Sequence, residues 1–328
     1  MNNVLLEVKD LETSLKINNE WLATVENISF ELSKGEVLGI VGESGCGKSI
    51  LSKSIIKLLP EKISKLSNGE VIFDGKRIDT LNEKQLLDIR GNDIAMIFQE
   101  PMTALNPVFT IKNQLVESIK SHKKISKKEA NNLAKDLLKK VGIARQDEIL
   151  NSYPHQLSGG MRQRVMIAMA ISCSPKLLIA DEPTTALDVT IQAQILDLLK
   201  ELQKETQMAI MMITHDLSVV AEFCDKALVM YAGQIVEFGG IKEILHNPKH
   251  PYTQKLLSTI PKLKEEQKRL ETIEGIVPSI QAFHVNKCRF ANRCNKKLDI
   301  CNNQSPKMHV CEDVIVRCHL YKNEYKEI

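Results

Sequence analysis

The stretch "EVLGIVGESGCGKSILSKSIIKLL", Glu36 to Leu59, joins a short apolar run, a glycine-rich loop and a segment with helical spacing. The apolar run is typical of a buried strand, and the loop, Gly42 to Ser49, matches the pattern G-x-x-x-x-G-K-S. A strand, such a loop and a helix, in that order, form the context in which this pattern binds nucleotide phosphates. The stretch therefore predicts an α/β fold organised around a phosphate-binding loop.

The residue types of this loop suit phosphate chemistry. Its glycines allow backbone N–H groups to wrap around a β-phosphate, and Lys48 brings a positive charge to the β- and γ-phosphates. The Ser49 hydroxyl is the expected Mg²⁺ ligand, whereas the Cys46 thiol occupies a variable position and is assigned no reactive role. The nucleotide-binding residues predicted here are Gly42, Glu43, Ser44, Gly45, Cys46, Gly47, Lys48 and Ser49.

Strand-like and helical segments alternate through most of the chain. Further strands are expected in "GEVIFDG", "NDIAMIFQ", "KLLIAD" and "MAIMMITHD", and a helix in "IQAQILDLLKELQKE". A lysine-rich stretch from Ile111 to Val141 indicates a mostly helical insert, and "KALVMYAGQIVEFG" is expected to form a hairpin that turns at Ala232-Gly233. This alternation predicts a mainly parallel sheet covered on both faces.

Composition and hydropathy limit the classes of function. The 328-residue chain has a formal net charge of +3, with 43% hydrophobic and 26% charged residues, which gives no general argument for nucleic-acid binding. No apolar run approaches the roughly 18 residues that cross a bilayer. The N-terminus lacks the basic start and apolar core of a signal peptide. We therefore expect a cytoplasmic protein.

Polar residues stand at the ends of three predicted strands. Asp181 ends "LLIAD" and is expected to face Mg²⁺, and Glu182 beside it is placed to activate a water molecule. Gln99 closes "AMIFQ", where it could contact the metal and the attacking water, and His215 follows "MMIT". Alone, a strand-end glutamine or histidine has no special meaning. Together with the phosphate loop, these residues predict a nucleotide-hydrolysing site with Glu182, His215 and Gln99 as catalytic residues.

A second anion site is expected at "LSGGMRQR", Leu157 to Arg164, more than a hundred residues after the phosphate loop. Two glycines and a serine precede a stretch with helical spacing. The bare amides and the dipole at a helix start both favour negative charge. The sequence therefore predicts that Ser158, Gly159 and Gly160 bind a phosphate.

The chain resembles the nucleotide-binding subunit of an ATP-binding-cassette transporter over roughly residues 1–240. The resemblance rests on the phosphate loop and, in this order, on "IFQEP", "LSGGMRQR", "LLIADEP", "TALD" and "ITHD". It implies a P-loop ATPase core with an antiparallel β-subdomain and a helical subdomain at about 100–165. Residues 241–328 would form a small Cys-rich C-terminal extension. The implied reaction is hydrolysis of ATP to ADP and phosphate, with Mg²⁺.

The resemblance also assigns roles to single residues. In this family two domains pack head to tail, so Ser158, Gly159 and Gly160 are implied to hold the γ-phosphate bound by the partner's phosphate loop. Glu182 is the implied general base, and His215 would contact the γ-phosphate. Mg²⁺ would be served by Ser49, Gln99 and Asp181, and Asp188 of "TALD" would couple the two sites.

One position departs from the family pattern. The family usually stacks an aromatic residue on adenine upstream of the phosphate loop, and the aligned position here is Leu15. Trp21, the only tryptophan, is the candidate substitute. Packing of Trp21 within the β-subdomain is the alternative.

A finer resemblance lies outside the core. "QEPMTALNP", "NPKHPYTQKLLSTIP", "CRFANRC" and "VRCHLY" are similar to stretches of the ATPase subunits of bacterial oligopeptide and dipeptide importers. This resemblance implies a second ATPase subunit, two membrane permeases, an extracytoplasmic binding protein and a peripheral position on the cytoplasmic face of the plasma membrane. It implies ATP-driven peptide uptake. The alternatives are a nickel-importer ATPase or a soluble ATPase of the same superfamily in DNA repair or translation.

Five of the eight cysteines lie in the last 41 residues, which in a cytosolic protein favours metal binding over disulfides. Cys288, Cys294, Cys301 and Cys318 are separated by five, six and sixteen residues, a poor zinc pattern. Four thiolates can instead hold an iron–sulfur cluster, and the resemblance to peptide-importer ATPases, some of which carry a 4Fe-4S cluster there, favours the same assignment. Free structural thiols and zinc are the alternatives, and Cys311 is the expected spare thiol.

Overall fold

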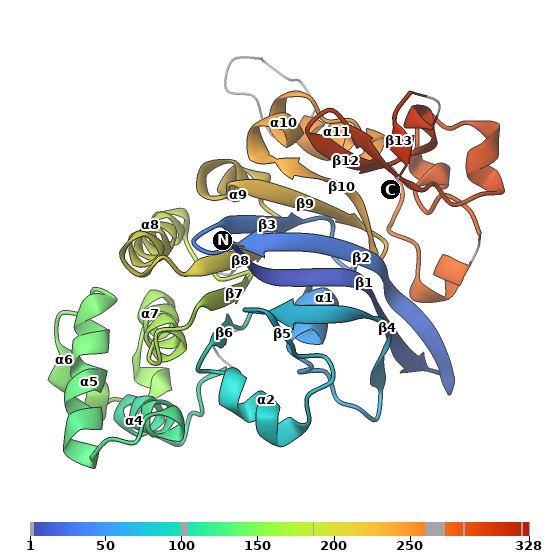
Figure 1. The fold of residues 1–328 in the computed structure, drawn as a ribbon. Coiled ribbons are helices and arrows are strands. Elements are labelled where there is room, and N and C mark those ends of the chain that lie inside the picture. Colours follow the sequence, from blue (N-terminus) through green and yellow to red (C-terminus); the bar gives the residue numbers. More distant parts are fainter. Residues whose placement is uncertain are drawn as a thin grey trace. The chain divides into compact units, whose positions relative to one another are not determined.

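The computed structural model describes residues 3–99, 104–185, 187–259, 273–284, 286–322 and 324–327. Residues 100–103, within the "QEPMTALNP" stretch, and Ala186 of "TALD" lie outside these ranges. The chain, whose elements are labelled in Figure 1, divides into two compact units. The phosphate-loop unit comprises Met1–Leu32, Val37–Asp79 and Met212–Ile328, and the helical unit comprises Ser33–Glu36 and Thr80–Met211.

A four-stranded sheet forms one part of the phosphate-loop unit. Its strands, in the order β2-β1-β4-β5, are β2 (Glu20–Ser33), β1 (Val4–Ile17), β4 (Ser64–Phe73) and β5 (Lys76–Arg77). β1 and β4 pair antiparallel, with Leu6 opposite Phe73. β1 and β2 are joined by Asn18 and Asn19, whose positive φ angles of 49° and 70° suit a tight hairpin. This sheet confirms the antiparallel β-subdomain.

The phosphate loop of this unit follows a fully buried strand. β3 (Val37–Val41) pairs in parallel with β9 (Lys226–Tyr231), and the loop leads from β3 into α1 (Lys48–Ile55). α9 (Leu217–Phe223) packs on β3, where a Cβ on Gly39 would lie 2.6 Å from a methyl carbon of Val220. The apolar run before the loop is therefore a central strand, as its composition indicates.

The chain after Gly233, called the tail below, adds antiparallel strands to the sheet that contains β3 and β9. β10 (Gln234–Gly240) pairs with β9 across the predicted Ala232-Gly233 turn and with β12 (Val314–Arg317) on its other side. β11 (Met308–Cys311) lies between β12 and β13 (Lys326–Glu327). The sequence predicted the β9–β10 hairpin but not the later strands β11, β12 and β13. The predicted parallel pairing is found between β3 and β9, whereas the strands from β9 to β13 pair antiparallel.

Short helices also occur among the described residues of the tail. They are α10 (Ile241–His246), α11 (Pro251–Ser258) and the 3₁₀ turns η2 (Ile280–His284), η3 (Ala291–Arg293), η4 (Asp299–Asn302) and η5 (His319–Tyr321). The buried Glu237 carboxylate of β10 accepts hydrogen bonds from the backbone N–H groups of Lys249 (2.6 Å) and His250 (3.0 Å). These bonds join the start of α11 to the sheet.

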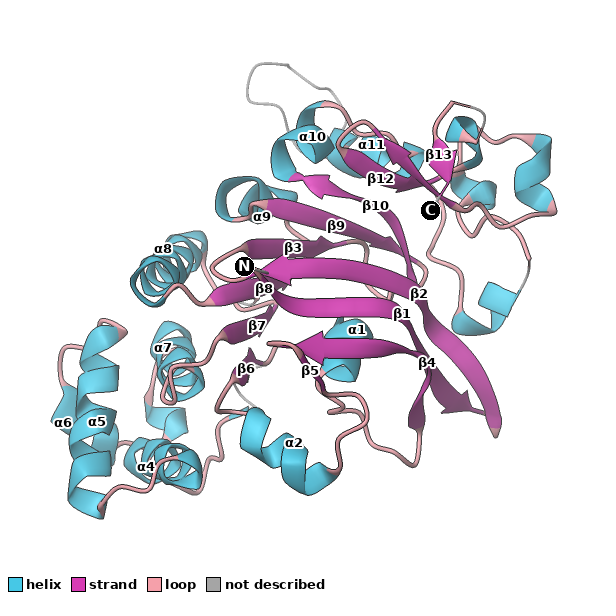
Figure 2. Ribbon diagram, in the orientation of Figure 1, coloured by secondary structure: helices cyan, strands magenta, loops and turns pink. Residues whose placement is uncertain are grey.

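The helical unit contains most of the longer helices, which Figure 2 shows in cyan. Its elements are α2 (Glu83–Ile89), β6 (Ile94–Ile97), α4 (Ile111–His122), α5 (Lys127–Lys140), α6 (Gln146–Asn151), η1 (Pro154–Gln156), α7 (Gly159–Ala170), β7 (Leu177–Asp181) and α8 (Val189–Thr206). α4 and α5 confirm the helical insert predicted at Ile111 to Val141. Ser126 and Glu129 form a capping box at the start of α5.

β6 and β7 of the helical unit pair in parallel, as predicted, and α7 packs against β6. β8 (Ala209–Thr214) carries the chain from this unit back into the phosphate-loop unit. None of the helices within the described ranges has the length and hydropathy needed to cross a bilayer.

Candidate functional site

The phosphate loop presents backbone N–H groups at the start of α1. Gly47 is the N-cap of this helix with a φ of 104°, and no side-chain hydrogen bond caps it among the described residues. Gly42 and Gly45 also have positive φ angles, of 155° and 79°. The Nζ atom of Lys48, a residue that is 6% exposed, donates to the carbonyl oxygens of Gly42 (2.7 Å) and Glu43 (3.1 Å). A lysine and the backbone amides at the start of a helix are suited to bind an anion.

The loop packs against the β9–β10 hairpin. A Cβ on Gly42 would lie 2.3 Å from the carbonyl oxygen of Met230, so only glycine fits there. The N–H of Gly233 donates to the carbonyl oxygen of Cys46 at 2.8 Å. The Cys46 thiol is buried, and burial raises its pKa, so it stays protonated.

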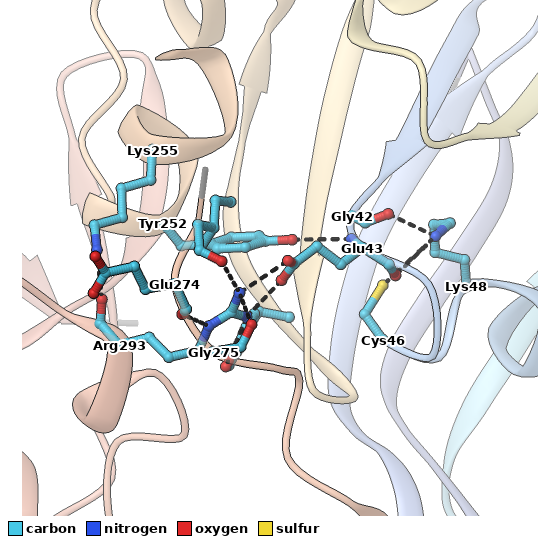
Figure 3. Close-up of polar contacts among 11 residues, drawn as sticks. Gly42, Glu43, Cys46, Lys48, Tyr252, Lys255, Glu274, Gly275 and Arg293 are labelled. Carbon is cyan, nitrogen blue, oxygen red and sulfur yellow. Dashed lines mark hydrogen bonds and ion pairs between the residues drawn. The ribbon is translucent and has the colours of Figure 1, made fainter. Parts of the chain in front are cut away.

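Two residues of the tail contact Glu43 in the loop. The guanidinium of Arg293, from η3, forms an ion pair with the Glu43 carboxylate, and the Glu43 N–H donates to the Tyr252 hydroxyl at 3.0 Å (Figure 3). Neither residue was predicted to belong to the site. The only local signal was a carboxylate inside a loop that is predicted to bind phosphates.

His215 directly follows β8 and is exposed. The Thr214 hydroxyl before it accepts from the N–H of Asp216 at 3.0 Å, and the Asp216 carboxylate accepts from the N–H of Ser218 at 2.8 Å. These bonds fix the turn between β8 and α9. The structure therefore places His215 at a strand end, as the sequence predicted.

In the helical unit, the structure brings Gln99 and Glu182 together. The Glu182 Oε2 atom accepts hydrogen bonds from Gln99 Nε2 (3.1 Å) and from the Thr185 hydroxyl (2.8 Å). Neither bond was predicted from the sequence. Asp181, the last residue of β7, is 2% exposed. Glu182 has a φ of 49°, and left-handed backbone in a residue other than glycine is enriched at functional sites.

The second predicted anion site lies at the start of α7. Ser158 is the N-cap, and its hydroxyl accepts from the N–H of Met161 at 3.3 Å. A Cβ on Gly160 would lie 2.8 Å from a methyl carbon of Ile191 in α8, whereas one on Gly159 would meet only an ordinary contact at 3.5 Å. Gly160 is thus required by helix packing. The exposed Gly159 leaves its backbone accessible.

Asp188 caps the neighbouring helix. Its Oδ1 atom accepts from the N–H of Ile191 at 3.0 Å at the start of α8. Capping by aspartate stabilises a helix by about 1 kcal/mol. Asp188 therefore has a structural task in this unit, and its coupling role stays a prediction.

Comparison with known proteins places these features in a family. Residues 25–185 match the family model described as ABC transporter. The oligopeptide transport ATP-binding protein AppD of Bacillus subtilis is 47% identical over 326 residues, which cover 99% of each chain. This chain belongs to the ABC transporter family. It is an ATPase of that family and uses ATP with Mg²⁺.

Other matches agree with this assignment. The probable peptide ABC transporter ATP-binding protein y4tR of Sinorhizobium fredii is 49% identical over 93% of this chain and 91% of its own. Residues 236–301 match the model described as Oligopeptide/dipeptide transporter, C-terminal region. A solved dimer of the ATP-binding cassette MJ0796, bound to ADP and Pi, superposes with a TM-score of 0.65 at 28% identity and covers 72% of this chain and 99% of its own. The ABC cassette fold is therefore confirmed.

Four cysteines of this ABC ATPase lie near one another in the tail. The pKa of Cys318 is raised to about 12, mainly by burial and in smaller part by the nearby thiols of Cys288, Cys294 and Cys301. The N–H of Cys288 donates to the carbonyl oxygen of Cys301 at 3.0 Å. Cys311 has Lys249, Glu237 and Glu312 among the charged groups around it.

The four thiols do not form a single-ion site. Within the part of the chain that the structure describes, no three His, Cys, Asp or Glu side chains are arranged to hold one metal ion. All four cysteines are free of disulfides.

Neither candidate for the adenine contact lies in the core. Leu15 is half-buried in β1 opposite Ser64. Trp21, near the β1–β2 hairpin turn, is 39% exposed, and the Nζ atom of Lys65 lies 4.7 Å from its ring centroid. The Trp21 ring is therefore accessible at its edge of the sheet, and stacking on adenine stays a prediction.

Proposed function

We propose that this ABC ATPase energises uptake of oligopeptides or dipeptides through partner membrane permeases. The observation that carries the proposal is the full-length match to AppD, which is named an oligopeptide transport ATP-binding protein. The core alone resembles ABC ATPases in general, whereas the match of residues 236–301 to the oligopeptide/dipeptide C-terminal region supports the peptide class.

Uptake of labelled peptides tests this function. A strain without this gene should lose transport of a radiolabelled dipeptide or oligopeptide. The wild-type gene should restore this transport, whereas a gene that encodes Lys48→Ala should not. Nickel uptake measured in the same strains tests the alternative cargo. Loss of nickel uptake with intact peptide uptake would assign the chain to a nickel importer. A DNA-repair or translation defect with both uptakes intact would assign it to a soluble ABC ATPase.

The proposed assembly contains a second ABC ATPase subunit, which we propose is a paralogue, two integral membrane permeases and an extracytoplasmic substrate-binding protein. The chain itself would sit peripherally on the cytoplasmic face of the plasma membrane. The relatives named as peptide transport proteins support this proposal. Co-purification of the tagged chain with permeases from detergent-solubilised membranes would test it.

The proposed roles in ATP hydrolysis follow from the chemistry of each side chain. Lys48 and the loop amides from Gly42 to Ser49 hold the phosphates, and His215 contacts the γ-phosphate. Glu182 acts as the general base, and its bonds from Gln99 and Thr185 support this role because they hold one carboxylate oxygen in a defined place.

Ser49, Gln99 and Asp181 would serve Mg²⁺. Oxygen atoms of hydroxyl, amide and carboxylate groups are the ligands that this ion prefers, so the residues fit it. Mg²⁺, when bound, neutralises charge on the phosphate oxygens.

The start of α7 would complete the ATP site of the partner subunit. An exposed Gly159 and a serine cap at the N-terminus of a helix support this proposal, together with the match to a cassette solved as a dimer. Asp188 would couple the two sites from the neighbouring helix start.

A mixing experiment tests sharing between subunits. Ser158→Arg should retain ATP binding through its own phosphate loop but lose ATPase activity, because a long cation replaces the capping hydroxyl at the partner's phosphate. Lys48→Ala should also be inactive. Where two copies of the chain form the dimer, a mixture of both variants should recover part of the activity, because one mixed site carries neither change.

The matched control for this experiment is Ser126→Arg, which removes the serine cap of α5 instead of that of α7. It should lose a similar amount of helix stability, about 1 kcal/mol, and keep its ATPase activity. Full activity of Ser158→Arg alone would contradict sharing between subunits.

We also propose that Cys288, Cys294, Cys301 and Cys318 bind a 4Fe-4S cluster with a structural role. The mutual proximity of these four free thiols supports this donor set. A cluster of four irons holds its cysteine sulfurs further apart than one metal ion does. The absence of a single-ion site among the described residues is therefore compatible with the cluster. Zinc and free thiols remain the alternatives.

Anaerobic purification tests the cluster. The wild-type protein should be brown and contain iron and sulfide, and Cys294→Ser should lose both colour and iron because a ligand is removed. Cys311→Ser is the matched control and should keep them. A colourless anaerobic preparation with stoichiometric zinc would contradict the cluster and leave the ATPase assignment intact.

A further inference from the structure

Glu43 places a carboxylate in a loop whose proposed ligand is the phosphate chain of ATP. Such loops attract anions through N–H groups and lysine, so an uncompensated carboxylate would oppose binding. In this chain the carboxylate is compensated by a residue of the tail. Arg293 Nη1 lies 2.6 Å from Glu43 Oε2, and Arg293 Nη2 lies 2.9 Å from Glu43 Oε1. This bidentate arrangement is the strongest geometry for an arginine–carboxylate pair.

The Arg293 side chain is held in place by its surroundings and is only 6% exposed. Its Nε atom donates to the carbonyl oxygen of Glu274 (2.8 Å), and its Nη2 atom donates to those of Ile273 and Gly275 (3.2 Å each). Lys255 Nζ donates to the carbonyl oxygen of Arg293 at 2.8 Å (Figure 3). The hydrogen bond to Glu43 raises the pKa of Arg293, so it keeps its charge.

A second residue of the tail contacts the backbone of Glu43. The Tyr252 hydroxyl accepts from the Glu43 N–H at 3.0 Å, and the tyrosine is fully buried. Its ring lies 4.8 Å from the ring of Tyr231 and 5.4 Å from that of Phe290, measured between centroids. The buried His250 accepts from the Tyr252 N–H at 3.0 Å. Tyr252 therefore offers the loop a rigid acceptor.

We propose that the tail positions and neutralises the phosphate loop for ATP, with Arg293 and Tyr252 as positioning residues that act through Glu43. This inference rests on the proposed ATP site. Arg293 cancels the charge of the Glu43 carboxylate and holds it, and Tyr252 fixes the adjoining backbone. Because Cys294 directly follows Arg293, the fold of the cysteine segment and the affinity for ATP are coupled.

Equilibrium binding of a fluorescent, non-hydrolysable ATP analogue to the full-length chain tests the proposal. Arg293→Gln leaves the Glu43 carboxylate unpaired beside the phosphates, and the Kd should rise on the order of tenfold. Arg293→Gln combined with Glu43→Gln removes that charge as well and should recover most of the lost affinity. Added salt should reduce the loss in the single variant, because salt screens charge repulsion.

Two further variants separate the effect of loop positioning on ATP affinity from the effect of charge. Arg293→Lys keeps a positive charge without the planar fork, so its Kd should fall between those of the wild type and Arg293→Gln. Tyr252→Phe keeps the aromatic packing and removes only the acceptor of the Glu43 N–H, and its Kd should rise at any salt concentration. Both variants remain informative where Arg293→Gln does not fold.

Arg317→Gln is the matched control. Arg317 is also buried in the tail and donates to the carbonyl oxygen of Ile235 at 3.0 Å, not to the phosphate loop. Its loss should lower the melting temperature and leave the Kd for the analogue unchanged. A Kd unchanged by Arg293→Gln, or a double variant as weak as the single one, would overturn the proposal. Failure of the wild type to bind the analogue, or full binding by Lys48→Ala, would instead overturn the ATP site itself.

Discussion

Glu182→Gln should bind ATP as tightly as the wild type and hydrolyse it more slowly by roughly two to four orders of magnitude, the usual contribution of a general base. The amide keeps the size of the side chain and can still accept from Gln99 Nε2 and the Thr185 hydroxyl. It cannot take a proton from water. The site should therefore remain assembled but lack its base, and the variant should accumulate as an ATP-bound dimer.

Steady-state phosphate release and size-exclusion chromatography with ATP measure these two effects. Glu201→Gln makes the same chemical change on an exposed part of α8 and should leave turnover unaltered. A Glu182→Gln variant with wild-type turnover would remove Glu182 from the role of general base. The ABC ATPase assignment would stand in that case, because it rests on the whole chain.

Lys48→Ala should abolish detectable ATP binding. Lys48 is the cation of the phosphate loop, and its Nζ atom also bonds the carbonyl oxygens of Gly42 and Glu43. Alanine removes both the charge offered to the phosphates and two bonds that shape the loop. Isothermal titration with ATP should show no heat of binding at concentrations that saturate the wild type.

The control for this variant lies on the same helix. Lys53 is in the last turn of α1, away from the loop, and Lys53→Ala should keep wild-type affinity. Near-normal ATP binding by Lys48→Ala would contradict the placement of the phosphates on this loop. A melting curve recorded for both variants separates loss of binding from loss of fold.

Local patterns were enough for much of the site. The apolar run before Gly42 predicts a buried strand because strands inside α/β sheets are apolar on both faces. The loop glycines follow from the backbone conformations that the phosphate loop requires, and the positive φ angles of Gly42, Gly45 and Gly47 agree with that requirement. Asp181 and Gln99 could be placed at strand ends because a strand is itself a local feature.

Local patterns could not predict contacts between segments that are distant in the sequence. Arg293 is 250 residues from Glu43 in the sequence, and nothing near either residue encodes the pair. Strand β12 is a four-residue run that becomes a strand because it pairs with β10 on one side and with β11 on the other. Short runs of this kind have too little periodicity to predict a strand.

The sequence by itself determined the strand–loop–helix core, the catalytic candidates and the family resemblance, because each depends on residues close together along the chain. Only the tertiary structure showed that Cys318 lies near Cys288, Cys294 and Cys301. It also showed that Tyr252 and Arg293 contact the phosphate loop. The physical reason is that packing brings these groups together through sheet pairing and burial, which depend on the whole fold and not on local sequence.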